Sequence, residues 1–354
     1  VIILYIQENS MLAVQRRLPM SINRIREILK SAGFYIPEDG GTAKKVYEHF
    51  SGRYFIPIPK ELSSILDGLL LGDGNMKCSS DPLDTERFLP LSKYQDALNT
   101  SHHLVKSLRS NDIDVTEAAT KRNKALEVLS KARTAFFNMH KSALEEPWLH
   151  FLAQKFRTHG YQVTISPRGT IEFRTCKTVQ LYVLYQQWYP RGIKQLSHMK
   201  LTPFSLLCWY VGDGSSSKTI TFSTQSFTKA KNEYLVSLLD DLGIIAKVAS
   251  TKDKRTGKVY HYLYIPHRHR SRVLDYFNSA HEITEAMSLV KRLLPWKFDL
   301  SIRRKDVYDP VNEFVDEDWL RTFLNLLKQV GVDISERSLE LHLLFPWKFP
   351  LPRV

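Results

Sequence analysis

Apolar residues recur with helical spacing in two stretches of the chain and alternate with polar residues in several shorter ones. Leu62–Gly74 and Phe204–Gly214 are mostly apolar, and both end in Gly-Asp-Gly. Runs of this length and composition predict two buried helices. The shared ending, which recurs 140 positions later along the chain, predicts that the chain contains two related halves.

The residues after each apolar stretch also correspond between the two halves. Alternation predicts a strand at Lys218–Phe227, followed by a helix that ends near Gly243. The first half has similar residues at Arg133–His140, again followed by an apolar helical stretch. Both halves then turn into another strand, Gly169–Thr175 in the first and Lys258–Ile265 in the second. Each half therefore reads helix, strands, helix, strands.

The start of the chain predicts a small helical domain over residues 1–50. Ser10–Leu18 reads as one helix, and Ser21 is placed to cap a second helix that carries Arg24 and Arg26. Two short helices joined by a tight turn resemble a helix-turn-helix. The pattern leaves DNA reading and plain packing equally open.

The remaining segments complete the predicted domain organisation. One stretch of the first half is polar and helical and has no counterpart in the second half, so it reads as an insertion. The end of the chain collects acidic residues before a helix at about Trp319–Val330, and we expect it to cap the fold. The predicted boundaries are 55–200 for the first half, 78–130 for its insertion, 201–300 for the second half and 301–354 for a helical extension.

Composition narrows the choice of partner and compartment. The 354 residues include 50 Lys+Arg and 37 Asp+Glu, and the resulting net charge of +13 favours polyanions, although charge also serves solubility. Cys78, Cys176 and Cys208 are dispersed, which argues against a zinc ribbon or disulfide framework. They fit a reducing compartment such as a bacterial cytoplasm or an organelle interior. Apolar runs such as Leu69–Leu71 are far too short to span a bilayer, so we expect no membrane partner.

The two repeated aspartates, Asp73 and Asp213, occupy an unfavourable position for a carboxylate. Each lies at the C-terminal end of an apolar helix, where the macrodipole is negative. Two such placements predict a compensating cation. Gly72 and Gly212 precede the acids, and small residues one turn earlier would let the helices pack closely and bring the carboxylates together. The alternative is two ordinary core helices capped by the final glycines, which leaves the paired acids without a partner.

These motifs, in their context, resemble those of the LAGLIDADG homing endonucleases in the single-chain form with two motifs. The nine positions of the signature fall on Leu66–Gly74 and Leu206–Gly214, and Trp188-Tyr189 and Leu201-Thr202-Pro203 match before the second copy. The resemblance covers residues 55–300. It implies an α+β fold of pseudo-symmetric tandem αββαββα repeats. The motif helices would form the central interface, and two sheets would form a DNA-binding saddle.

The resemblance also implies an activity, a cofactor and a partner. The activity is that of a site-specific DNA endonuclease, which makes a double-strand break in a long target site by metal-dependent phosphodiester hydrolysis. Asp73 and Asp213 match the metal-binding acids, with Gly72 and Gly212 beside them. The implied cofactor is Mg²⁺, as two or three divalent ions for which Ca²⁺ or Mn²⁺ can substitute. Two carboxylates that share such ions can stabilise both the attacking and the leaving oxygen. The implied partner is double-stranded DNA, bound by a monomer.

Three further residues are implied as catalytic supports. Lys194 matches a lysine just before the second motif that assists the metal-bound water, and Lys297 would be its counterpart in the second half. Gln225 matches a polar position beside the metal site. The first half carries Met139 at that position, which would make the two sites chemically unequal.

The DNA-binding surface is expected on the second sheet and its loops, where basic residues alternate with tyrosines. Lysines and arginines there suit phosphate contacts, which position a protein without reading sequence. The alternative is a solvated hairpin with Gly257 at its tip. His261, His267 and His269 suggest zinc, but no cysteine lies nearby, and a phosphate-facing role is favoured. The predicted DNA-binding residues are Lys218, Thr224, Lys252, Lys254, Arg255, Lys258, Arg268, Arg270 and Arg272, with Arg24 and Arg26 of the N-terminal helices.

Two other functions use the same scaffold. Relatives of this family act as intron maturases, so an RNA-splicing factor that binds intron RNA is one alternative. The other is a non-cleaving DNA-binding regulator that pairs this fold with a helix-turn-helix. The presence of both aspartates argues for cleavage, since a binder needs no metal cluster, but it does not exclude RNA.

Overall fold

The computed structural model describes residues 1–36, 56–78, 91–130, 133–165, 170–196, 199–216, 218–299, 301–335, 341, 345 and 348. The predicted domain boundary near residue 50, residues 79–90 of the insertion and most of 336–354 lie outside these residues. The chain forms two compact units. We call them the helical unit (1–57, 77–136 and 177–195) and the sheet unit (58–76, 137–176 and 196–354). None of the described helices is both long and apolar enough to cross a bilayer.

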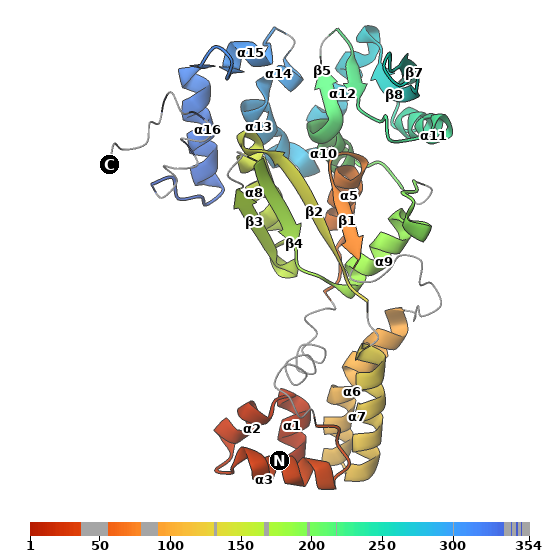
Figure 1. Ribbon diagram of the computed structural model, residues 1–354, viewed down its shortest axis with the longest axis vertical. Coiled ribbons are helices and arrows are strands. Elements are labelled where there is room, and N and C mark those ends of the chain that lie inside the picture. Colours follow the sequence, from red (N-terminus) through yellow and green to blue (C-terminus); the bar gives the residue numbers. More distant parts are fainter. Residues whose placement is uncertain are drawn as a thin grey trace. The chain divides into compact units, whose positions relative to one another are not determined.

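Two four-stranded sheets with the same strand order carry the predicted strands (Figure 1). The first has the order β1-β2-β4-β3 and the second β5-β6-β8-β7, and the pairings that the register defines are antiparallel. The mixed α+β fold class is therefore confirmed. The strands are β1 (Asn75–Cys78), β2 (Ala135–Ser142), β3 (Tyr161–Ile165), β4 (Thr170–Thr175), β5 (Gly214–Ser216), β6 (Ile220–Phe222), β7 (Lys247–Lys252) and β8 (Val259–Ile265).

The two motif helices, α5 (Lys60–Leu71) and α10 (Pro203–Asp213), pack against each other in the sheet unit (Figure 1). They come very close to each other at Gly68, where an added Cβ would lie 2.1 Å from the carbonyl oxygen of Ser205. The predicted close packing through a small residue is thus confirmed. The facing residue on α10 is Ser205, which also closes the N-terminal capping box of that helix with Thr202.

The strand predicted at Lys218–Phe227 is much shorter in the structure. β6 ends at Phe222, and the next residues form a turn in which the Phe227 amide donates to the Thr224 carbonyl at 2.9 Å. The Thr224 hydroxyl donates to the side chain of Asn232, and Thr228 caps the helix that follows, α11 (Lys229–Asp240). These side-chain bonds replace the ladder that alternation alone predicts.

Helices cover the sheets and extend the sheet unit. α8 (Glu146–Lys155) packs on β3 and β4, and α11 packs on β7 and β8. The helix predicted at Trp319–Val330 is α16 (Glu317–Gln329), which packs on α8 and α13. The remaining elements after β8 are α12 (Arg270–Ser279), α13 (Thr284–Leu293), α14 (Pro295–Phe298), α15 (Arg304–Val307), β9 (Tyr308–Asp309) and β10 (Phe314–Val315).

The helical unit joins the N-terminal helices to the insertion. Ile25, Leu29 and Phe34 share one hydrophobic core with Leu104 and Ala118 of the insertion. Three short N-terminal helices bury little apolar surface by themselves, so the long helices of the insertion supply the other half of their core. The helices are α1 (Ile2–Glu8), α2 (Met11–Arg17), α3 (Ile22–Ser31), α6 (Leu91–Arg109), α7 (Val115–Ser130) and α9 (Val179–Trp188).

A buried arginine, Arg122, fixes this shared core. Its guanidinium lies 4.6 Å from the centre of the Tyr5 ring and donates to the Asn9 side chain at 3.1 Å. Burial lowers the pKa of Arg122, although Tyr5 acts in the opposite direction. A buried charge needs such partners, so Arg122 ties α7 to the first helix in one specific arrangement.

Candidate active site

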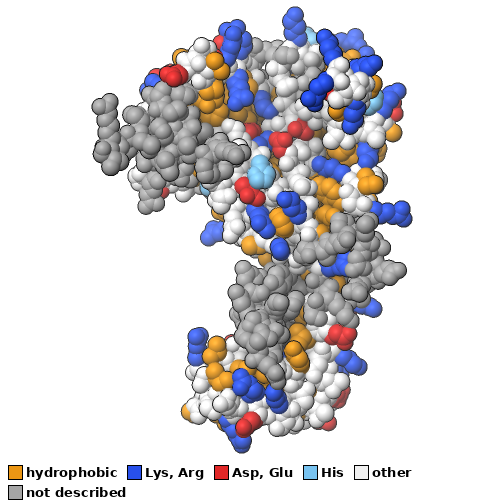
Figure 2. All heavy atoms as spheres, viewed as in Figure 1, with side chains coloured by type: hydrophobic (Ala, Val, Ile, Leu, Met, Phe, Trp, Pro, Cys, Tyr) orange, Lys and Arg blue, Asp and Glu red, His pale blue; other side chains and the backbone are white. Residues whose placement is uncertain are grey.

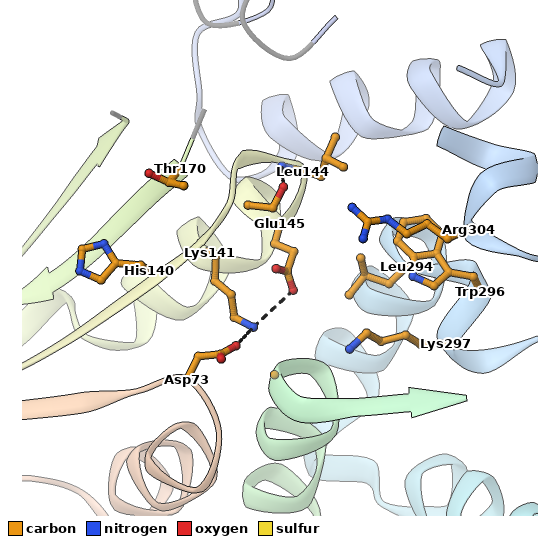
Figure 3. A pocket seen from close by; sticks show the side chains of 12 residues that line it. Asp73, His140, Lys141, Leu144, Glu145, Thr170, Leu294, Trp296, Lys297 and Arg304 are labelled. Atoms are coloured by element: carbon orange, nitrogen blue, oxygen red, sulfur yellow. Dashed lines mark hydrogen bonds and ion pairs between the residues drawn. The ribbon is translucent and has the colours of Figure 1, made fainter. Parts of the chain in front are cut away.

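A cavity of about 370 Å³ lies in the sheet unit at the C-terminal ends of the two motif helices (Figure 3). Asp73 and Gly212 bring the helix ends into its wall. β2 and the turn after it contribute further polar side chains, and α14 and α15 form the opposite side. The lining residues are Asp73, His140, Lys141, Ser142, Leu144, Glu145, Thr170, Gly212, Leu294, Trp296, Lys297 and Arg304.

Asp73 and Asp213 come together where α5 and α10 end. A Cβ atom added to Gly212 would lie 3.7 Å from a carboxylate oxygen of Asp73, and one added to Gly72 would lie 3.8 Å from the carboxyl carbon of Asp213. Both aspartates also act electrostatically on the same two lysines, Lys141 and Lys297. The two repeated motifs therefore build one acidic site.

Lys141, which sequence reasoning missed, provides a cation for the first aspartate. Its ammonium donates to the Asp73 carboxylate and lies 3.6 Å from Glu145. Burial lowers the pKa of Lys141, but Glu145 and Asp73 outweigh burial and raise it, so this lysine is charged at neutral pH. Met139, which we expected at the polar position of this half, is buried in the core. The available indication was that Lys141 follows Phe137 and Met139 on one face of β2.

Lys297 provides a cation at the end of the second motif helix. Its ammonium donates to the carbonyl oxygens of Tyr210, Val211 and Gly214 at 3.3, 2.8 and 2.7 Å. These carbonyls carry the negative end of the α10 dipole, so Lys297 offsets the charge that disfavours Asp213. Burial lowers the pKa of Lys297 to about 8. Lys297 reaches the predicted site, and its three donors are committed to the helix end.

The donors at this site suit a hard divalent ion. Asp73 and Asp213 offer carboxylate oxygens, and Mg²⁺ needs only one or two carboxylates because it keeps water ligands. Within the described residues, no group of three or more His, Cys, Asp or Glu is arranged to hold a metal. Asp73 and Asp213 are the residues here that would hold such an ion.

The other two predicted supports have different surroundings. Gln225 is exposed in the turn after β6 and does not line the cavity. Lys194 belongs to the helical unit, where its ammonium lies 5.8 Å from the centre of the Trp188 ring.

The predicted DNA-binding residues of the second sheet are mostly exposed. Lysine and arginine side chains are prominent over the part of the surface formed by β7 and β8 (Figure 2). Two of the predicted residues are not exposed. Thr224 is fully buried, and Arg270 is half-buried with a hydrogen bond of 3.2 Å to Ser216. The exposed members are Lys218, Lys252, Lys254, Arg255, Lys258, Arg268 and Arg272.

The three histidines near this surface do not form a zinc site within the described residues. His261 hydrogen-bonds to Ser250 on the neighbouring strand at 2.8 Å, and His269 accepts from Arg268 at 3.0 Å. His267 is exposed. The phosphate-facing role that we favour for this segment stays a prediction.

The predicted second helix of the N-terminal pair is present as α3. Ser21 caps it by accepting from the Arg24 amide, as predicted, and Gly33 follows its end in a left-handed conformation. Arg24 is exposed and Arg26 is half-buried, and each hydrogen-bonds within its own helix, Arg24 with Glu27 and Arg26 with Asn23.

Part of the chain is similar to a known protein family. Residues 123–272 match the LAGLIDADG DNA endonuclease family. Solved structures of mesophilic variants of the homing endonuclease I-DmoI share 16% identity with this chain, cover 66% of it and 99% of their own length, and have a TM-score of 0.35. The LAGLIDADG meganuclease I-AabMI bound to uncleaved DNA shares 11% identity over 76% of this chain and 98% of its own, with a TM-score of 0.33. No curated protein sequence matches the chain.

Proposed function

We propose that this protein, which matches the LAGLIDADG DNA endonuclease family over residues 123–272, is a site-specific DNA endonuclease that uses divalent metal ions. The observation that carries the proposal is the meeting of Asp73 and Asp213 at the ends of two packed helices, beside a cavity that Asp73 and Gly212 line. A nucleic-acid binder has no need for paired acids placed against two helix dipoles. Phosphodiester hydrolysis needs such acids, because carboxylates at this place can hold Mg²⁺.

The chain's own residues divide the work at this site. Bound Mg²⁺ would supply an activated water and neutralise phosphate charge. Asp73 and Asp213 would hold the ions, with the backbone of Gly72 and Gly212 beside them. Lys297 fixes the end of α10 and thereby the position of Asp213.

Lys194 and Gln225 keep their proposed roles in assisting the attacking water and the metal shell. Both roles rest on the family resemblance. Lys141 is a buried cation on the first-motif side, where it pairs with Asp73 and Glu145.

Binding to double-stranded DNA would use the exposed basic side chains of β7, β8 and their loops. These residues would contact phosphates, and the strands between them would read bases in the major groove. Counterion release then makes affinity fall with salt, at a slope of about −0.9 per neutralised phosphate.

Cleavage of DNA that spans the gene's own insertion site tests the proposal. A supercoiled plasmid carries that sequence uninterrupted, and its nicked and linear forms are followed with and without Mg²⁺. The wild-type protein should linearise the plasmid only with metal. Asp73→Asn and Asp213→Asn should bind but not cleave, because each keeps size while removing a charge needed for the ion.

A matched control and an RNA arm complete this test. Asp299→Asn changes an exposed aspartate that bonds to Ser301, and it should cleave as the wild type does. Full activity in either motif mutant would refute the assignment of the acids. Binding to the intron transcript without any DNA cleavage would favour the splicing function.

A further inference from the structure

Most cationic side chains that line the cavity at the ends of α5 and α10, which we call the Asp73 cavity, already bind other groups of the protein. Lys141 pairs with Asp73 and Glu145. Lys297 gives its three donors to backbone carbonyls of α10 and β5. The cavity also holds His140, which lies 4.0 Å from Glu172. Arg304 is the remaining cationic side chain among the residues that line the cavity.

Arg304 lies in the wall of the cavity opposite Lys141 and is held there by an aromatic ring. Its guanidinium carbon is 5.9 Å from the centre of the Trp296 ring, and Figure 3 shows the guanidinium directed toward the side of Glu145. The ring centres of Trp296 and Trp319 lie 6.4 Å apart, and the indole N–H of Trp319 donates to the Leu293 carbonyl at 3.0 Å. A chain of aromatic contacts from α16 thus supports Arg304.

The guanidinium of Arg304 makes no hydrogen bond or ion pair with the described residues. Its neighbour Arg303 differs, since it forms two bonds to Asp306 at 2.7 and 2.8 Å. Arginine presents five donors in a planar fork that matches the oxygens of a phosphate. Arg304 therefore has its full donor set available to a group that enters the cavity.

We propose that Arg304 binds the scissile phosphate of the nucleic acid in the Asp73 cavity. The proposal deepens the proposed function and rests on it for the identity of the scissile group. A phosphate that enters meets the acids Asp73 and Glu145 in the lining, with Asp213 close to Asp73, so it needs positive charge beyond that of the metal. Arg304 supplies this charge from a segment outside both motif repeats, and it would stabilise the extra charge of the transition state.

Single-turnover cleavage with matched variants tests this role. Arg304→Ala should lower the cleavage rate by about 10²-fold at saturating protein, because it removes donors aimed at the developing charge. The cleavage rate of Arg304→Lys should lie between those of the wild type and Arg304→Ala, since lysine keeps the charge but lacks the planar fork of donors. Trp296→Leu should also slow cleavage by loosening the guanidinium. Arg303→Ala, next in sequence and paired outward, should cleave at the wild-type rate. A wild-type rate in Arg304→Ala overturns the proposal.

A binding measurement keeps the two proposals distinguishable. The salt dependence of affinity for the same duplex is measured with Ca²⁺ in place of Mg²⁺, so that it does not depend on cleavage. Arg304→Ala should reduce the slope of log K against log salt by about 0.9, the value for one phosphate, while Arg303→Ala should not. If the wild type binds but never cleaves, the endonuclease proposal fails, and the salt slope of Arg304→Ala alone tests whether Arg304 binds a phosphate. A slope equal to that of the wild type would overturn the role of Arg304. The melting temperature of each variant confirms that it is folded.

Discussion

Each catalytic aspartate that we propose is balanced by a lysine from a distant part of the chain. Asp73 and Asp213 lie at the negative ends of two helices, where a carboxylate alone is unfavourable. Lys141, from β2, pairs with Asp73, and Lys297, from α14, covers the carbonyls beside Asp213. The residue that satisfies the first acid is therefore an ammonium that a metal ion would have to share or displace.

This pairing predicts that Lys141 competes with metal ions. Lys141→Met should destabilise the metal-free protein by about 1–3 kcal/mol, because it leaves Glu145 and Asp73 without their cation. Added Ca²⁺ should then raise the melting temperature more than it does in the wild type, since the freed carboxylates bind it more tightly. Thermal melts with Ca²⁺ and with a chelator measure both effects.

The control for this experiment is Lys155→Met. Lys155 pairs with Glu61 at 3.2 Å on the surface, where an ion pair contributes little. Lys155→Met should therefore show the same Ca²⁺-induced rise in melting temperature as the wild type. Equal shifts in all three proteins would contradict competition at Asp73.

At the scale of elements, the packed pair α5 and α10 sets the geometry of the site. Their close approach at Gly68 leaves no room for a side chain, and it determines how near the two helix ends come. Gly72 and Gly212, nearer the helix ends, have ordinary contacts, since a Cβ on either would lie 3.7 Å from its nearest neighbours. The two positions should therefore respond differently to the same substitution.

Gly68→Ala should destabilise the protein by about 2–3 kcal/mol, because the added methyl overlaps the backbone of Ser205 and must push the helices apart. Gly212→Ala lies within α10 and has space for its methyl, so it should be neutral or slightly stabilising. Urea denaturation of both variants measures the difference. Similar stabilities would show that the crossing at Gly68 is not as tight as described.

The lysine at the end of α10 predicts a pH dependence of stability. Burial lowers the pKa of Lys297 to about 8 from its ordinary value of 10.5. Between these values the unfolded chain holds a proton that the folded chain has released, so the free energy of unfolding should rise with pH. From pH 8 to about pH 9.5, the wild type should gain about 1–2 kcal/mol relative to Lys297→Met. Denaturant titrations across this range measure the gain, and parallel curves would contradict the lowered pKa.

At the scale of the whole molecule, the N-terminal helices and the insertion form one unit although 54 residues separate Ile36 from Leu91, the first residue of α6. Leu29 of α3 and Leu104 of α6 belong to the same core. The insertion therefore gives α3 a rigid support. Arg24 is exposed on α3, and Arg26 beside it is half-buried; we call the surface that these two residues form the basic face of α3.

We predict that this face contacts DNA flanking the cleavage site. Arg24→Ala combined with Arg26→Ala should shorten the nuclease-protection footprint on one side and reduce the salt slope by about 1–2, while single-turnover cleavage stays within about twofold. Lys121→Ala, which removes an exposed lysine paired with Glu117 on α7, is the control and should leave the footprint intact. An unchanged footprint in the double variant would assign α3 to packing alone.

The sequence by itself determined the two motif helices, the repeated order of strands and helices, and the aspartates that meet at their ends. These features are local, since apolar periodicity, Ser and Gly caps and a repeated Gly-Asp-Gly each act within a few residues. Tertiary structure decided which side chains reach the site from elsewhere. Lys141 and Arg304 lie 68 and 231 residues from Asp73 along the chain, and no local pattern encodes such a contact.

Tertiary structure also decided where predicted polar residues are buried. Thr224 is buried because it bonds to Asn232 eight residues later, and the strand predicted through it ends at Phe222 for the same reason. The N-terminal helices and the insertion share a core, and the sequence does not show which distant segment packs against the other. Burial and charge pairing depend on neighbours in space, and these become defined only when the chain has folded.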